Sequence, residues 1–189
     1  MNRRLVTARL ITGRLVAALL AAASAGWILA APSTAQPILP AQQLQGTFHM
    51  SGTVTVAVNI PGEWPGQPVT RTWTFTPLCS TAPCAKVELL RRRATGTDTV
   101  MLHAIGPRAY TGVGRFNAPL RCTGRLYRPG EIVPFTIRVT VTATTRADTG
   151  IAASAIRATY VNTSRLNLTP CIGVFGHDAA RYTGQLPPA

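Results

Sequence analysis

Apolar and polar side chains alternate along most of the chain after residue 46. From Phe48 to Ile60 every even position carries an apolar residue or glycine, and nearly every odd position carries a polar one. A repeat of two residues predicts a β-strand that buries one face. The segment from Val133 to Arg146 alternates in the same way. Both segments exceed the usual length of a strand, which favours the bent or coiled strands of a barrel.

Shorter segments of the same kind occupy residues 69–75, 86–92, 99–105, 108–113, 119–127, 151–161 and 180–184. Turn-forming stretches separate several of them, namely IPGEWPGQP, IGPR, RPGE and RADTG. Residues 36–189 show no helical periodicity, and threonine and valine abound where strands are predicted. We therefore expect an all-β domain of about 8–9 strands. It is either an antiparallel up-and-down, lipocalin-like barrel or a β-sandwich, and the long strands favour the barrel.

The N-terminal segment has the order of a secretory signal peptide. Arg3, Arg4, Arg9 and Arg14 come first, an apolar run from Leu15 to Ala31 follows, and small residues come last. We expect cleavage before Gln36, with an uncleaved anchor as the alternative. The predicted organisation is a signal peptide at 1–35, a flexible linker at 36–45, a single β domain at 46–184 and a tail at 185–189. The protein is then secreted, to the medium or the cell envelope, with no transmembrane segment after cleavage.

Four cysteines follow the signal segment, at positions 79, 84, 122 and 171. In an exported chain an even number of cysteines indicates disulfides. Cys79 and Cys84 would stand about 17 Å apart on a straight strand, so a turn must bring them together, and Pro77, Ser80, Thr81 and Pro83 are turn formers. We predict the pairs Cys79 with Cys84 and Cys122 with Cys171. The spacing does not match a zinc site, and we expect no metal.

The chain is basic, with 19 Lys and Arg against six Asp and Glu. Such a surface attracts anionic partners, although a solvated cationic surface explains the same charge. The bias to arginine suggests a GC-rich genome and an actinobacterial origin. The candidate binding residues are Arg91, Arg92, Arg93, Arg121, Arg125, Trp64 and Trp73. Few aromatic residues are interleaved with the cations, so we expect no nucleic-acid partner.

No catalytic motif is visible in the sequence. The six acidic residues after position 35 form no recognisable pair, and three of them, Glu63, Glu131 and Asp148, lie in predicted turns. The histidines, at positions 49, 103 and 177, have no nucleophile motif near them. We therefore expect a protein that is not an enzyme and needs no cofactor.

The stretches WTFTPLCSTAPC, RCTGRLY and ATYVNTSRLNLTPC together resemble uncharacterised small secreted actinobacterial β-domain proteins. The likeness spans about residues 46–184, implies a secreted β domain and carries over no catalytic residue. Gly46-Thr47-Phe48 is similar to the Gly-x-Trp that begins lipocalin-like barrels, with Phe in place of Trp.

Three functions remain open. The first is a secreted, non-catalytic binding module for an envelope lipid, a glycan or an acidic polymer. The second is a structural or protein-interaction component of the cell envelope, whose partner is another exported protein. The third is an unrecognised hydrolase, which would need a polar pocket with a histidine near a carboxylate.

Overall fold

A computed structural model describes residues 42–94, 96–147, 150–171 and 175–187, and these residues form strands and turns without a helix. The expected signal peptide, residues 36–41 of the expected linker and Asp148 lie outside the described residues. The strands are β1 (Gln42–Gln43), β2 (Gly46–Val58), β3 (Pro68–Pro77), β4 (Lys86–Arg93), β5 (Gly96–Gly106), β6 (Ala109–Cys122), β7 (Arg125–Ala147), β8 (Gly150–Asn162), β9 (Leu166–Asn167) and β10 (His177–Gln185). The described part of the chain therefore has no helix long and apolar enough to cross a membrane.

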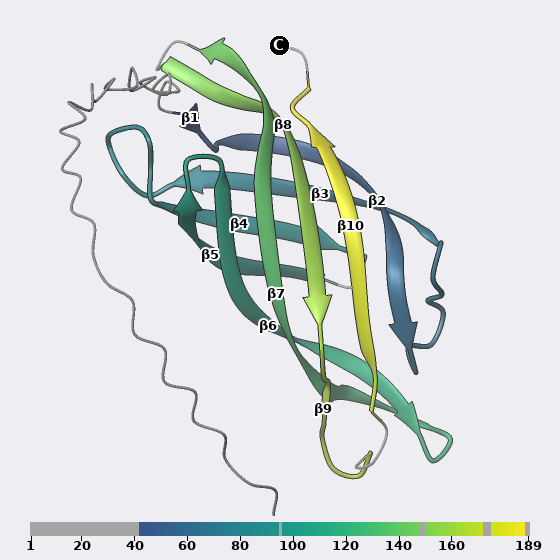
Figure 1. Cartoon of the computed structure of the whole chain (residues 1–189). Helices are drawn as coiled ribbons and strands as arrows, with labels where there is room; N and C mark the ends of the chain where they lie inside the picture. Colours follow the sequence, from purple (N-terminus) through teal and green to yellow (C-terminus); the bar gives the residue numbers. More distant parts are fainter. Residues whose placement is uncertain (1–41, 95, 148–149, 172–174, 188–189) are drawn as a thin grey trace, which may run out of the picture. The chain divides into compact units, whose positions relative to one another are not determined.

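Eight of the strands close into an antiparallel barrel (Figure 1). Each strand from β2 to β7 pairs with the next one along the chain, and β10 pairs with both β8 and β2. The two-residue strand β1 pairs with β8 beyond the part that β10 covers, and β9 pairs with β7 before the part that β8 covers. This is the up-and-down barrel of the sequence prediction, and the sandwich alternative was wrong.

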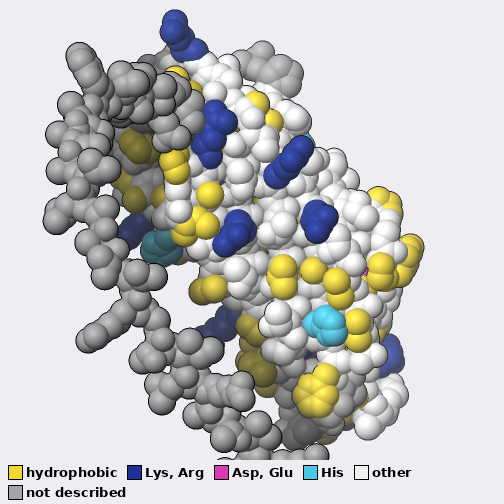
Figure 2. Space-filling view, viewed as in Figure 1, with side chains coloured by type: hydrophobic (Ala, Val, Ile, Leu, Met, Phe, Trp, Pro, Cys, Tyr) yellow, Lys and Arg dark blue, Asp and Glu magenta, His cyan; other side chains and the backbone are white. Residues whose placement is uncertain are grey.

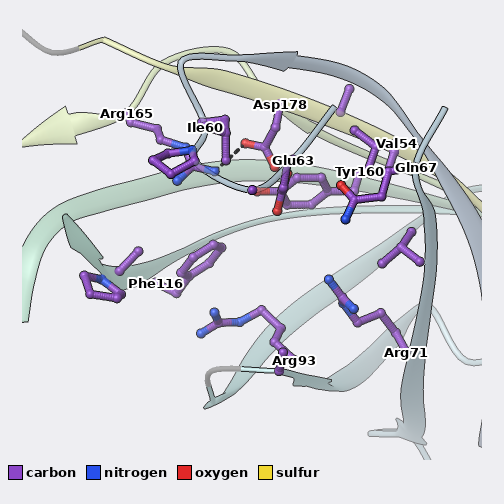
Figure 3. A pocket seen from close by; sticks show the side chains of 18 of the residues that line it. Val54, Ile60, Glu63, Gln67, Arg71, Arg93, Phe116, Tyr160, Arg165 and Asp178 are labelled. Atoms are coloured by element: carbon purple, nitrogen blue, oxygen red, sulfur yellow. Dashed lines mark hydrogen bonds and ion pairs between the residues drawn. The ribbon is translucent and has the colours of Figure 1, made fainter. Parts of the chain in front are cut away.

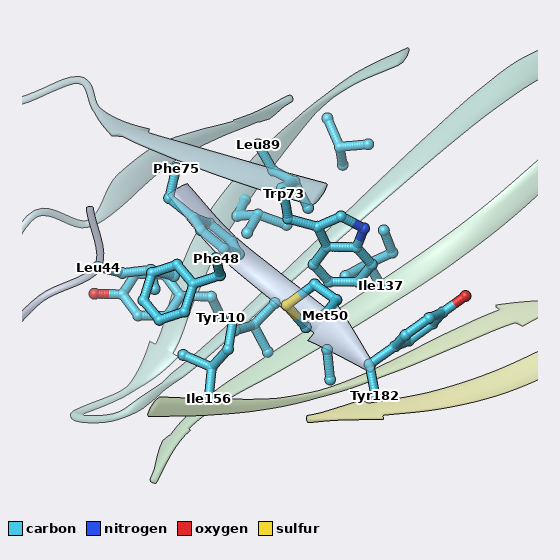
Figure 4. Packing of buried hydrophobic residues seen from close by; sticks show 14 of the residues in the cluster. Leu44, Phe48, Met50, Trp73, Phe75, Leu89, Tyr110, Ile137, Ile156 and Tyr182 are labelled. Atoms are coloured by element: carbon cyan, nitrogen blue, oxygen red, sulfur yellow. The ribbon is translucent and has the colours of Figure 1, made fainter. Parts of the chain in front are cut away.

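Buried and exposed side chains alternate along the barrel strands, and the buried ones fill the interior. On β2 the side chains of Phe48, Met50 and Val54 are buried, and on β7 so is every odd position from 131 to 141. Phe48 and Met50 of β2 and the side chains at 135, 137, 139 and 141 of β7 pack into one core, drawn in Figure 4. We call the end of the barrel where β2 begins the closed end, because Leu44 and Tyr110 are buried there against Phe48. The other end, where β2 finishes and β10 begins, is the open end.

A glycine makes room for an aromatic ring in this core. Gly114 on β6 pairs with Phe135 on β7, and a Cβ added to Gly114 would lie 2.5 Å from Cζ of that ring. The ring of Phe135 therefore occupies the space that a side chain at 114 would take. A ring that covers a strand glycine in this way pins the register of the two strands.

Both predicted disulfides are present. Cys79–Cys84 closes the connection between β3 and β4 at the closed end, with 5.5 Å between the α-carbons. Cys122–Cys171 ties the β6–β7 turn to the segment after β9 at the open end, with 5.7 Å between the α-carbons. No described cysteine is free. The two disulfides are consistent with an oxidising, exported environment.

One predicted strand and one predicted turn were wrong. Residues 119–127 are not one strand, because a two-residue turn at Thr123 and Gly124 (φ of 49° and 76°) separates β6 from β7. Positive φ at both positions is the geometry of a type I′ hairpin turn. RPGE is not a turn but lies inside β7, where the register shifts opposite Pro119 and Gly130 packs against Leu120. A bulge tolerates a proline because the ladder there needs no N–H donor.

The described domain also starts before the predicted boundary at Gly46. Gln42 and Gln43 pair in parallel with Ile151 and Ala152 of β8. The side chain of Leu44 is fully buried. This short segment closes the base of the core, so it is part of the domain.

Candidate functional site

A cavity of about 660 Å³ opens at the open end of the barrel (Figure 3). Every barrel strand except β5 contributes to its wall, together with the loop between β2 and β3. An eight-stranded barrel has an interior just wide enough for side chains or for one small ligand. The apolar core fills the closed end of this barrel, and charged and aromatic side chains line the cavity at the other.

The loop between β2 and β3 folds over the cavity through two Pro-Gly turns. Glu63 N donates to Ile60 O at 3.2 Å, and Gln67 N donates to Trp64 O at 3.1 Å. Gly62 and Gly66 occupy the third position of these turns with φ of 79° and 90°, as a type II turn requires. The result directs Glu63 into the cavity wall and leaves Trp64 58% exposed.

Three arginines form one side of the cavity, and we call Arg71, Arg91 and Arg93 the arginine wall. Arg91 Nε donates to Asp98 Oδ2 at 2.8 Å, and Arg93 Nε donates to Asp98 Oδ1 at 2.5 Å. One carboxylate therefore serves two guanidinium groups, so a positive charge is left over. Burial lowers the pKa of Arg91, and the charge and hydrogen bond of Asp98 act against that shift.

Aromatic rings support the arginine wall. The guanidinium carbon of Arg91 lies 4.0 Å from the centroid of the Phe135 ring, and that of Arg93 lies 3.8 Å from the centroid of Phe116. A cation held over a ring at this distance is attracted by the ring quadrupole. The rings also fix the planes of both guanidinium groups, which orients their remaining N–H donors.

Carboxylates dominate the other side, and we call Glu63, Glu131 and Asp178 the carboxylate wall. Arg165 joins two of them, since Nη1 donates to Glu131 Oε1 at 2.5 Å and Nη2 donates to Asp178 Oδ1 at 2.9 Å. Burial by itself lowers the pKa of Arg165, but the two carboxylates raise it by more. One cation between two anions leaves a negative charge on this side.

Glu63, in the carboxylate wall, lies beside Tyr160. Figure 3 shows both near Asp178, with Arg71 and Arg93 across the cavity. Burial, and then the charge of Asp178, raise the pKa of Glu63, whereas Arg165 and Arg71 lower it by less. Burial also raises the pKa of Tyr160, so its hydroxyl stays protonated at neutral pH and can donate a hydrogen bond.

The structure separates the candidate residues of the sequence analysis into two groups. Arg91, Arg93 and Trp73 line the cavity, with Trp73 only 1% exposed, and Arg121 reaches its rim. Arg92 is exposed on the outer face of β4, and Trp64 is exposed on the loop. Arg125 lies outside the cavity, 5.8 Å from the centroid of the Tyr127 ring.

Sequence reasoning missed most of the polar groups in the cavity. The interpretation of Glu131 as a turn residue was wrong, because it is buried on β7. Arg71 precedes Trp73 and Phe75 at alternate positions, and Arg91 follows Val87 and Leu89 in the same way. Both arginines could have been predicted to face the interior, because each occupies a position in the alternation that is otherwise apolar.

The described residues contain no group of three His, Cys, Asp or Glu side chains placed to hold a metal. The three histidines, all within the described ranges, do not line the cavity. No family model, curated protein or solved structure matches this chain. The site is therefore interpreted from its own geometry.

Proposed function

We propose that this protein is a secreted, non-catalytic binding module that holds one small amphipathic ligand in the cavity at the open end. The observation that carries the proposal is the arginine wall, in which three arginines stand against one ion-paired carboxylate, Asp98, among the described residues. Guanidinium groups bind carboxylate and phosphate through paired, charge-assisted hydrogen bonds. Those bonds are stronger in a cavity that water enters poorly.

Two buried nitrogens support an anionic ligand group. Arg91 Nη2 and Arg165 Nε have no hydrogen-bond acceptor in the described part of the protein. Arg91 Nη2 lies 2.7 Å from Asp98 Oδ2, a distance that makes an ion pair without hydrogen-bond alignment. Buried donors are almost always satisfied, so an acceptor brought by a ligand would complete the site.

The rest of the cavity fits the other parts of such a ligand. The carboxylate wall and Tyr160 offer acceptors and a donor for hydroxyl or amino groups, and Trp73, Val69 and Leu120 offer apolar contact. A volume of about 660 Å³ suits a small molecule or the head of a lipid or glycan. Of the ligand classes expected from the sequence, the lipid and the glycan therefore fit the cavity better than a long polymer.

The two alternatives have weaker support. An interaction protein could use the exposed side chains of Trp64 and Phe175 near the open end, where Asn59 Nδ2 donates to Phe175 O at 2.7 Å. A hydrolase would need a histidine beside a carboxylate in the cavity, and the histidines lie elsewhere.

Trp73 provides the test, because it lies at the inner surface of the cavity. Trp27→Phe with Trp64→Phe leaves Trp73 as the sole tryptophan of the chain. The probe is 1-anilinonaphthalene-8-sulfonate, an apolar ring system with one anionic group. Binding in the cavity will quench Trp73 emission by energy transfer to the probe, with one probe per chain.

Two further variants locate the binding. Ala118 lines the cavity, so Ala118→Phe fills its mouth and is expected to weaken probe binding about tenfold or more. Ala143 is exposed on β7 outside the cavity, so Ala143→Phe is the matched control and should bind like the parent. Equal binding by the Ala118→Phe variant would overturn the proposal. Native mass spectra of protein from its own medium then give the mass of the natural ligand and the N-terminus.

A further inference from the structure

The outer surface of the barrel differs in charge from its cavity. Of the five acidic residues that the structure describes, Glu63, Asp98, Glu131 and Asp178 lie at the cavity or pair with its arginines. Glu88 alone lies elsewhere, half-buried on β4. The outer surface of the described residues is therefore almost purely cationic, and this charge does not depend on what the cavity binds.

Three arginines and their threonine neighbours form a regular outer face on β7, β8, β10 and β2. In one row Arg138 pairs with Thr159, which pairs with Arg181, which pairs with Thr53. In the next row Thr140 pairs with Arg157, which pairs with Thr183, which pairs with Ser51. We call these eight residues the Arg-Thr face.

The face is built as a checkerboard, in which each arginine has hydroxyl side chains as its cross-strand neighbours. Arg138 and Arg181 stand two strands apart, about 10 Å, and Arg157 is diagonal to each at about 7–8 Å. A depression of about 780 Å³ runs over the same residues. Figure 2 shows dark blue side chains spaced over a mostly white surface on the side that carries β7, β8 and β10.

These arginines do not contribute to the stability of the fold through ion pairs. All three are exposed, and within the described ranges none has an acidic partner. Three like charges held within about 10 Å repel one another. Their arrangement therefore calls for a partner that carries several negative charges at a similar spacing.

We propose that the Arg-Thr face binds an anionic polysaccharide. Guanidinium groups take its sulfate, phosphate or carboxylate groups, and the threonine hydroxyls take the hydroxyl groups of the sugar rings. The eight residues include no aromatic side chain on which a nucleic-acid base could stack. They include no large apolar side chain that would enter a membrane. The surface is independent of the cavity and stands whether or not the cavity binds a ligand.

The experiment measures the affinity of the full chain for heparin and for polygalacturonate, with neutral dextran as the control polymer. The variant Arg138→Gln/Arg157→Gln/Arg181→Gln removes the three charges of the face. The matched control Lys86→Gln/Arg92→Gln/Arg128→Gln removes three exposed charges elsewhere on the barrel. We expect the face variant to bind one or both anionic polymers about tenfold or more weakly at equal salt, and the control variant to stay within about twofold of the parent.

Three results would overturn the proposal. One is an equal loss in both triple variants, which would mean that only net charge matters. Another is binding of neutral dextran as tightly as the anionic polymers. The third is binding to phosphatidylglycerol vesicles or single-stranded DNA without binding to either anionic polysaccharide. A thermal melt of the face variant that matches the parent shows that any loss is not due to unfolding.

Discussion

Nη2 of Arg165 donates a 2.9 Å hydrogen bond to Oδ1 of Asp178, and both side chains are buried. Arg165 lies between β8 and β9, and Asp178 belongs to β10. The bond therefore joins the β8–β9 connection to β10 at the open end. The second bond of Arg165, to Glu131, adds β7 to the same group. One guanidinium thus positions the segment that carries β9 and two of the three residues of the carboxylate wall.

Replacing Arg165 will destabilise the fold strongly. Arg165→Met leaves Glu131 and Asp178 buried near each other without a cation, and breaking a buried ion pair from one side costs about 3–5 kcal/mol. Urea unfolding followed by circular dichroism measures the loss. Arg92→Met, at an exposed position, is the control and should change the free energy of unfolding by less than about 0.5 kcal/mol. A similarly small effect at 165 would show that the network does not hold the open end together.

Glu63 will make stability depend on pH with an unusual sign. Its pKa is raised above the ordinary 4.5, first by burial and then by Asp178, so the folded protein binds the proton more tightly than the unfolded chain. The folded state therefore loses stability as pH rises from about 4.5 through the raised pKa. Glu63→Gln has no proton to lose, so its stability relative to the parent should increase over that interval and then level off. Paired urea titrations at several pH values test this, and a constant difference would contradict it.

The two disulfides will differ in their contribution to stability. Cys122 and Cys171 are 49 residues apart and Cys79 and Cys84 are five apart. In the chain-entropy account the longer loop stabilises by about 4 kcal/mol and the shorter one by about 2 kcal/mol. Replacing each pair with alanine and comparing thermal unfolding gives the order. A larger loss from the Cys79 and Cys84 pair would contradict the account for this protein.

Gly114 will not accept a side chain. The Cβ of Gly114→Ala would approach the Phe135 ring at 2.5 Å, and overpacking of this kind costs about 1–3 kcal/mol. Gly106→Ala is the matched control, since nothing lies within 4 Å of a Cβ built there. Because the Phe135 ring also supports Arg91, the Gly114 variant should weaken binding of the anionic probe as well. Normal stability in the Gly114 variant would mean that the ring moves aside without cost.

Alternation along the chain was enough to predict the barrel strands, because a half-buried strand must alternate. The turn at Thr123 and Gly124 was not predicted, because Leu120, Cys122 and Leu126 continue the same two-residue alternation on either side of it. The RPGE segment carries a strong turn signal, yet pairing with β6 absorbs it as a bulge.

The candidate site was harder to predict than the fold. Arg91 and Trp73 were identified as candidates, and their phase along the strands places them inside. Asp98 became the partner of Arg91 only through the β4–β5 register, and Asp178 met Arg165 only through the closure of the barrel. Local sequence patterns do not predict contacts of that kind, because these contacts depend on how strands distant in the sequence align.

The closing strand is the last of the described strands. Among those strands, β10 alone pairs with both β2 and β8, and it begins at His177. A chain synthesised from its N-terminus therefore cannot finish the barrel, or give Arg165 its second carboxylate, until residues 177–185 have been made. A product cut short before residue 177 would leave one edge of β2 and one edge of β8 unpaired, as templates for other chains.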